Sequence, residues 1–183
     1  PYLDFVQSSY TYSGNFNWQT GSNILNNIID SNGTVLGNIS TIQNSNNQSI
    51  VASLNFDKFY RNFKFLNKKN NLFDVIKSLK RVRVNYTENS GKVIPGYVPS
   101  IGFFGTTKPS FGFIFGNQSN VRYELAKRGY LTNFSGFNEQ FQQIFNSKFE
   151  MSAEIQLFKN LKIDLNANRN YSNNYSENYR VNN

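Results

Sequence analysis

Two stretches near the C-terminal end of the sequence alternate strictly between apolar and polar residues. Over residues 149–157 every odd position is apolar and every even position is polar, and the same pattern holds over residues 161–168. Because successive side chains of a β-strand point to opposite faces of its sheet, each stretch predicts a strand with one apolar and one polar face. The short Asn-containing turn 158–160 predicts a β-hairpin, whose second strand is expected to continue into the Asn/Tyr/Ser-rich residues 171–179.

A similar alternation is present in the N-terminal part of the chain. The apolar residues that share one parity there are Val6, Tyr10, Tyr12, Phe16 and Trp18. They predict a strand of up to about 17 residues, where strands of globular proteins usually have roughly 5–6. Residues 34–43 alternate weakly and residues 49–56 clearly, so both are expected to be strands, with the Asn/Ser/Gln cluster 44–48 as the turn between them.

The middle of the chain, residues 67–146, has no sustained period-2 pattern. Apolar residues at i, i+3, i+4 and i+7 predict a short amphipathic helix, formed by Leu72, Val75, Ile76 and Leu79. A second short helix is expected over residues 119–128, with Ser119 or Asn120 as its N-cap and Gly129 as its C-terminal stop.

The remainder of this segment is expected to hold a short strand around residues 82–86 and an irregular, glycine-containing stretch over residues 91–116. These patterns divide the chain into three parts. Residues 1–66 form sheet strands, residues 67–146 form an inserted irregular and helical segment, and residues 147–183 form a sheet hairpin.

The composition limits the possible chemistry. Apolar residues make up 38% of the 183 residues and charged residues 16%, but 18 Phe and 11 Tyr make the chain rich in aromatics, so disorder is not expected. Cys and His are both absent, which excludes disulfides, thiolate nucleophiles, zinc sites and a His general base. We therefore expect no enzyme activity and no cofactor. The net charge of +8 is compatible with nucleic acid, acidic lipid or lipopolysaccharide and does not choose among them.

Two kinds of local motif allow more than one interpretation. The glycine-flanked segments 102–105 and 112–116 lack the Lys-Ser/Thr of a phosphate loop, and tight turns beside packed Phe side chains explain them better. Residues 59–65 interleave aromatic residues with Lys and Arg. This pattern suits either a surface for single-stranded nucleic acid or the rim of a membrane barrel.

The long alternating strands favour the membrane. A soluble antiparallel sheet buries its apolar face against a second layer, and the sequence predicts few helices that could supply one. In a membrane barrel lipid solvates the apolar face, the polar face lines water, and strands of ~9–11 residues suffice to cross. About five or six strands are too few, because the smallest such barrels have about eight and hydrocarbon tolerates no open sheet edge. We therefore predict an all-β chain that forms an antiparallel sector of a much larger transmembrane β-barrel, with the irregular segment packed at its lumen or rim.

This interpretation assigns roles to individual side chains. Those expected to face lipid are Met151, Ile155, Leu157, Leu161, Ile163 and Leu165. Those expected to face the lumen are Glu150, Glu154, Lys162 and Asp164. Those expected to form aromatic girdles are Tyr10, Tyr12, Trp18, Tyr171 and Tyr175.

Two other classes remain open. The first is a soluble or cell-surface β-sandwich or solenoid module of the adhesin type. The second is a basic nucleic-acid binder, although the polar faces of the strands carry too few basic residues for us to expect it. The chain begins with Pro1-Tyr2-Leu3 and no initiator Met, so we expect a piece of a longer protein.

Several short sequence blocks follow one another in a single order along most of the chain. They are Leu36-Gly-Asn-Ile, Leu54-Asn-Phe, Tyr60-Arg-Asn-Phe-Lys-Phe-Leu, Tyr86-Thr-Glu-Asn-Ser-Gly, Ile94-Pro-Gly-Tyr-Val-Pro-Ser, Phe113-Ile-Phe-Gly-Asn-Gln-Ser-Asn-Val-Arg, Gly129-Tyr-Leu-Thr, Ala153-Glu-Ile-Gln-Leu-Phe, Leu161-Lys-Ile-Asp-Leu-Asn-Ala-Asn-Arg and Tyr175-Ser-Glu-Asn-Tyr. In these blocks the chain resembles the SprA/Sov family, giant outer-membrane translocons of the type IX secretion system of Bacteroidetes. It departs from the family at Arg61-Asn62 and at the turn Phe158-Lys159.

The resemblance implies a location, a function and partners. The family forms a very large single-chain barrel in the outer membrane that passes folded cargo proteins, with a link to gliding motility in some members. The implied neighbours are outer-membrane lipid and lipopolysaccharide, a shuttle barrel, a plug protein, periplasmic accessory subunits and the secreted cargo, and no nucleic acid.

Overall fold

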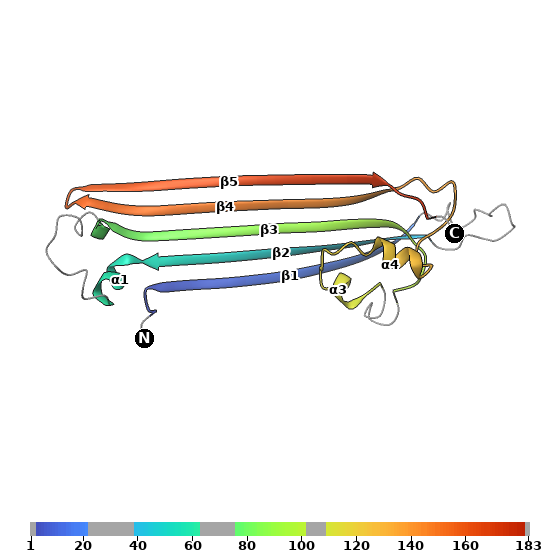
Figure 1. The fold of residues 1–183 in the computed structure, drawn as a ribbon, viewed down its shortest axis with the longest axis horizontal. Coiled ribbons are helices and arrows are strands. Elements are labelled where there is room, and N and C mark those ends of the chain that lie inside the picture. The colour runs from blue at the N-terminus through green and yellow to red at the C-terminus, as the bar shows by residue number, and fades with distance from the viewer. Residues whose placement is uncertain (1–2, 22–38, 63–75, 102–108, 182–183) are drawn as a thin grey trace. The chain divides into compact units, whose positions relative to one another are not determined.

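The computed structural model describes residues 3–21, 39–62, 76–101 and 109–181 (Figure 1). Its strands are β1 (Val6–Thr20), β2 (Ser40–Asn55), β3 (Leu79–Tyr97), β4 (Gln140–Phe158) and β5 (Leu161–Asn178). Its helices are α1 (Phe56–Asn62), α3 (Phe111–Ile114) and α4 (Arg122–Lys127). The strands form one five-stranded antiparallel sheet in the order β1-β2-β3-β4-β5, so each strand pairs with the next one along the chain. The all-β prediction is confirmed, and the sheet is not closed: β1 and β5 are its edges.

The chain divides into two compact units. Unit 1 consists of Pro1–Thr11, Gln48–Glu88 and Ser147–Tyr171, and unit 2 consists of Tyr12–Asn47, Asn89–Asn146 and Ser172–Asn183. Every strand contributes residues to both units. The two units are described separately below.

In unit 1, helix α1 begins directly at the end of β2. The side chain of Asn55 accepts a hydrogen bond from the backbone N–H of Lys58 at 3.1 Å, which caps the helix start. The Tyr60 side chain is buried, and its hydroxyl donates to the carbonyl of Ile76 at 2.6 Å. Phe59 packs edge-on against the Phe5 ring at 5.0 Å between centroids. The described part of the aromatic and basic stretch 59–65 therefore contributes packed rings to this helix.

Unit 2 contains the hydrophobic core. The buried residues that form it come from β2, β3, β4, α3, α4 and the segment after α4: Ile42, Ile94, Tyr97, Phe113, Leu125, Leu131 and Phe141. Helix α4 ends at Gly129, whose φ of +69° is in the left-handed region. The N–H groups of Gly129 and Tyr130 donate to the carbonyls of Ala126 and Leu125, the pattern of a Schellman motif. The predicted stop at Gly129 is thus confirmed.

The long N-terminal strand and the C-terminal hairpin are also confirmed. β1 has 15 residues, and β4 and β5 meet at a turn over residues 159–160. β5 continues to Asn178, as the Asn/Tyr/Ser-rich tract predicted. Helix α4 begins later than predicted, at Arg122, and its N-cap is Val121, so the prediction of Ser119 or Asn120 as N-cap is wrong. The side chain of Asn120 still accepts a hydrogen bond from the backbone N–H of Arg122 at 3.2 Å.

Three other local predictions are wrong. The cluster 44–48, predicted as a turn, lies inside β2, because the side chains of Asn44 and Asn46 are buried and hydrogen-bonded to a distant part of the chain. Residues 91–97, predicted to be irregular, belong to β3, because the strand predicted at 82–86 is present but extends over 19 residues. Leu79 begins this strand and does not end a helix.

Of the other residues of the predicted helix, Ile76 is helical, whereas Leu72 and Val75 lie outside the described residues, as do residues 34–38 of the weakly alternating stretch. Residues 67–146, which we expected to form an insert, include all of β3 and the first part of β4. The connection between these two strands carries α3 and α4.

Candidate functional site

The strands of unit 1 separate their side chains by polarity. On β3, Val82, Val84 and Tyr86 have one parity, whereas Arg81 and Arg83 have the other. The odd positions of β4 and β5 carry the apolar residues of the predicted lipid face, and their even positions carry the polar ones. Unit 1 therefore presents an apolar face and a polar face, and these two faces are the candidate functional surfaces.

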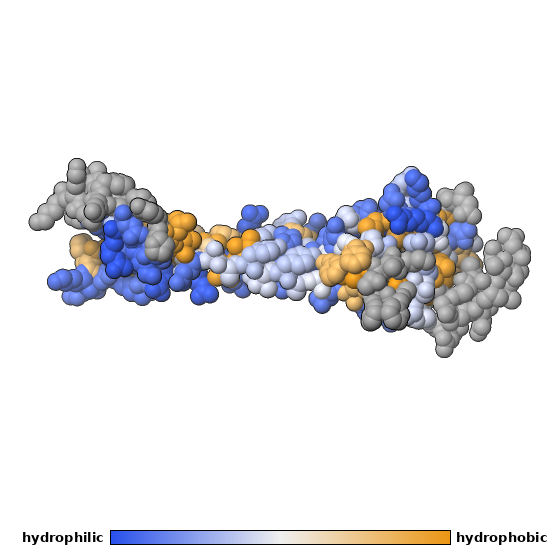
Figure 2. Space-filling view, turned by 90° about the horizontal axis from the view of Figure 1, so that it is seen from below, coloured by the Kyte–Doolittle hydropathy of each residue, from blue (hydrophilic) through white to orange (hydrophobic). Residues whose placement is uncertain are grey.

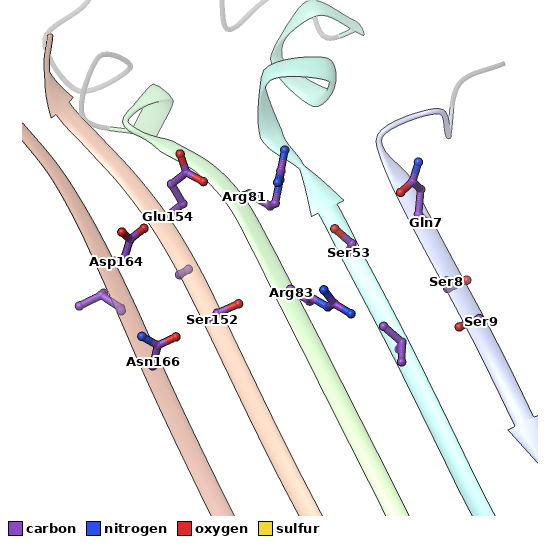
Figure 3. A pocket seen from close by; sticks show the side chains of 13 residues that line it. Gln7, Ser8, Ser9, Ser53, Arg81, Arg83, Ser152, Glu154, Asp164 and Asn166 are labelled. Carbon is purple, nitrogen blue, oxygen red and sulfur yellow. The ribbon is translucent and has the colours of Figure 1, made fainter.

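The polar face of unit 1 forms an open groove with a volume of about 750 Å³. Its lining comes from all five strands (Figure 3) and is mostly polar: Gln7, Ser8, Ser9, Val51, Ser53, Arg81, Arg83, Ser152, Ala153, Glu154, Asp164, Leu165 and Asn166. The predicted lumen residues Glu154 and Asp164 are among them, but so is Leu165, which we predicted to face lipid. Such a surface can hold water and hydrated solutes but offers no enclosed, apolar pocket for a small molecule.

The charges of the polar face come from three neighbouring strands. The Lys162 ammonium lies 3.5 Å from a carboxylate oxygen of Glu154 and 3.5 Å from one of Asp164, which brings three of the four predicted lumen residues together. The fourth, Glu150, pairs with Lys148 at 2.7 Å and accepts a hydrogen bond from Asn85 at 3.1 Å. These exposed ion pairs contribute little stability each, but they fix the polar character of the face.

The apolar face of unit 1 is open. Four of the six predicted lipid-facing side chains are exposed by 37–52%: Met151, Leu157, Leu161 and Leu165. The other two, Ile155 and Ile163, are half-buried. All six lie on the neighbouring strands β4 and β5. A hydrophobic surface of this extent calls for a partner that is not water.

The predicted girdle residues occupy different environments. In unit 1, Tyr10 is exposed and its hydroxyl donates to the Gln48 side chain at 3.1 Å, and Tyr171 is exposed on β5. In unit 2, the Tyr12 hydroxyl donates to the carbonyl of Phe115 at 2.6 Å. Tyr175 is exposed, and its hydroxyl donates to Glu177 at 2.9 Å. Trp18 packs against the hydrophobic core of unit 2.

In unit 2, other residues of the chain cover the sheet face formed by the even positions of β2, the positions that are apolar in unit 1. The even positions of β2 bury Ser40, Ile42, Asn44 and Asn46, and the connection between β3 and β4 packs over them. The Asn44 amide donates to the carbonyls of Phe113 and Asn117 at 3.0 and 2.8 Å. The Asn46 amide donates to the carbonyl of Gly116 at 2.8 Å. These side chains fasten the α3 region onto the sheet.

Lys92 and Arg122 hold the part of the β3–β4 connection around α4 against the sheet. The Lys92 side chain is buried, and its ammonium donates to the carbonyls of Gln118 and Ser119. Burial, and to a lesser extent the charge of Arg122, lowers the pKa of Lys92. The Arg122 guanidinium lies 3.8 Å from the centre of the Phe141 ring and pairs with Glu177 at 2.7 Å.

Sequence reasoning missed these anchoring residues. Asn44, Asn46 and Lys92 have the residue types of exposed turns and strand faces, and nothing local distinguishes them. One available signal was their parity, since all three share the parity of apolar neighbours on their own strands.

Other kinds of site were also considered. The described residues contain no group of three His, Cys, Asp or Glu side chains that could hold a metal ion. Within the same residues, no helix has the length and apolarity to cross a membrane. No protein-family model matches this chain, and no curated protein matches it.

Proposed function

We propose that this chain is a wall segment of a protein-conducting β-barrel in the outer membrane. The observation that carries the proposal is the pair of faces in unit 1: an exposed apolar face and a hydrated polar face on the same antiparallel strands. In a transmembrane barrel lipid solvates the first face and lumen water the second, so neither needs a further protein layer.

The length of three of the unit 1 segments supports the same proposal, whereas those of β1 (residues 6–11) and β2 (residues 48–55) are shorter. β3 contributes residues 79–88, β4 residues 147–158 and β5 residues 161–171. A strand that crosses the hydrocarbon core needs ~9–11 residues, so these segments are suited to one crossing.

The open edges supply a further argument. Among the described residues, no strand neighbours the outer sides of β1 and β5. Unpaired backbone groups in lipid cost several kcal/mol each, so a membrane sheet must close. Five strands cannot close when the smallest barrels have about eight. The proposal therefore requires neighbouring strands from the rest of a longer chain.

The cargo and partners rest on the resemblance to the SprA/Sov family. On that basis the barrel conducts folded proteins in type IX secretion and works with a shuttle barrel, a plug protein and periplasmic accessory subunits. The mixed charges and amides of the polar groove support such a role, because a hydrated wall without large apolar patches adheres weakly to passing protein surfaces.

The proposal is tested by labelling neighbouring positions on β5. These 183 residues contain no Cys, so Leu165→Cys and Asn166→Cys each add one site for a nitroxide in the full protein, in which any Cys outside this segment is first replaced by Ser, reconstituted in lipid vesicles. We expect the label at 165 to be relaxed mainly by oxygen, which concentrates in lipid, and the label at 166 mainly by a water-soluble nickel complex. Access of the nickel complex to both labels would refute the membrane assignment and favour the soluble adhesin-type module.

A further inference from the structure

Helix α3 presents two aromatic side chains to the outside of unit 2. Phe111 is 62% exposed and Phe115 is 59% exposed, and their ring centroids lie 5.5 Å apart. The third ring of this short helix, Phe113, is buried in the core. Figure 2 shows hydrophobic residues at the surface where α3 lies in Figure 1. The helix thus exposes a defined pair of apolar rings.

The backbone of this helix is held firmly in place. The Ser110 hydroxyl accepts a hydrogen bond from the N–H of Phe113 at 3.3 Å, which caps its start. Gly116 ends it with a φ of +84°. On the sheet side, Tyr12 and Asn46 donate hydrogen bonds to the carbonyls of Phe115 and Gly116. These bonds fix the direction in which the two exposed rings point.

Gly14 allows the close approach between the helix and β1. A Cβ atom at this position would lie 2.7 Å from the carbonyl carbon of Phe115, where real contacts stay beyond 3.0 Å. Only a glycine on β1 therefore admits the helix in this position. Buried amides, a glycine and a tyrosine hydroxyl all serve to hold a helix whose largest exposed groups are apolar.

Lipid is the partner that best fits this pair of rings. Tyr12 supports the helix and lies two positions after Tyr10 on β1, so both side chains are at even positions. Even positions of β1 belong to the apolar face in unit 1. That face meets hydrocarbon in the proposed function, so the strand leaves the hydrocarbon near Tyr12. Aromatic side chains concentrate at this level of a membrane, where ring and headgroup region are both accommodated.

We propose that Phe111 and Phe115 insert into the boundary between lipid headgroups and acyl chains. This inference rests on the proposed function. It assigns the membrane boundary to a particular element, whereas the sheet alone leaves the boundary free to slide along the strands.

The test uses tryptophan fluorescence in the full protein, reconstituted in phosphatidylcholine vesicles with bromine at shallow or deep acyl positions. Trp18 and any Trp outside this segment are replaced by Phe, and single tryptophans are then introduced as Phe111→Trp, Phe115→Trp, Leu165→Trp or Ile144→Trp. Ile144 is a matched control, because it is also an apolar residue of unit 2 and is 43% exposed. It lies at an even position of β4, on the face that is polar in unit 1, and lines a groove there.

We expect shallow bromine to quench positions 111 and 115 at least twofold more than deep bromine, and position 144 to be unquenched. Quenching at 165 with none at 111 and 115 would overturn this inference and leave the proposed function standing. Absence of quenching at 165 would remove the proposed function itself. If a tryptophan variant does not fold, Phe111→Cys with a nitroxide gives the same depth by its access to oxygen and nickel.

Discussion

The Tyr97 hydroxyl provides a sharp test of the unit 2 core. The Tyr97 side chain is fully buried, and its oxygen has no hydrogen-bond partner among the residues that the structure describes. A buried hydroxyl without a partner costs about 1–3 kcal/mol of stability. Tyr97→Phe removes this oxygen and keeps the ring that packs in the core, so we expect the free energy of unfolding to rise by about 1 kcal/mol.

Tyr179 supplies a matched comparison of opposite sign. Its hydroxyl donates to the carbonyl of Pro95, which is itself buried. Tyr179→Phe leaves that carbonyl unpaired, and we expect the free energy of unfolding to fall by about 1 kcal/mol. The two variants make the same chemical change, so only the surroundings of each hydroxyl can produce opposite results.

The pH dependence of the same residue is also defined. Burial, with a smaller contribution from Tyr130, raises the pKa of Tyr97 from 10.0 to about 12. Above pH 10 the unfolded state releases this proton while the folded state retains it. The stability is therefore fully present below pH 10 and is lost as the pH rises from 10 to 12, by about 3 kcal/mol for two pKa units. Tyr97→Phe removes this loss.

The assay is urea unfolding of the chain in detergent, followed by the fluorescence of Trp18. This residue is the only Trp of the chain and packs against the same core, so its signal reports on unit 2 directly. A loss of more than about 1 kcal/mol in Tyr97→Phe would mean that the hydroxyl has a partner. Our description of the core would then be refuted.

Three other substitutions test separate features. Ile163→Arg should cost ~2–4 kcal/mol of stability in lipid if the residue lies at mid-membrane, whereas Asp164→Arg should cost less than about 1; equal costs in urea titrations of the reconstituted protein would contradict the assignment of faces. Gly14→Ala should displace helix α3 and lower the midpoint of Trp18 unfolding, and an unchanged midpoint would show that the helix is not seated on β1. Arg122→Lys keeps the charge but loses the planar stacking on Phe141, so we expect a loss of about 1–2 kcal/mol; a loss below about 0.3 kcal/mol would assign the contact no role.

Strict alternation was the part of the fold that could be predicted from sequence. The hairpin of β4 and β5 was visible because every residue from 149 to 157 obeys one period, and parity alone then separates the two faces. The candidate site on this hairpin was predictable for the same reason. Lys162 pairs with Glu154 and Asp164 because all three share a parity on neighbouring strands.

The long-range contacts could not be predicted. Asn44 and Asn46 have a strong preference for turns, and a local reading of the cluster 44–48 follows that preference. In the structure their amides satisfy carbonyls near α3, about 70 positions away in the sequence, so they behave as strand residues. Likewise, the stretch 91–116 was predicted to be irregular because of its glycines, but residues 91–97 form the end of β3, where Gly96 has a φ of +83°.

The hydrogen bonds of Asn44 and Asn46 have a consequence for strand register. In unit 1 a shift of β2 by two residues would keep apolar side chains on one face and polar ones on the other, so the alternating pattern does not oppose it. In unit 2 the same shift would move both amides away from the carbonyls of Phe113 and Gly116 and leave buried polar groups unpaired. Because β2 is one continuous strand, the contacts with the α3 region define the register of the whole strand. The alternating pattern of β2 therefore allows more than one register, and the contacts with the α3 region select one of them.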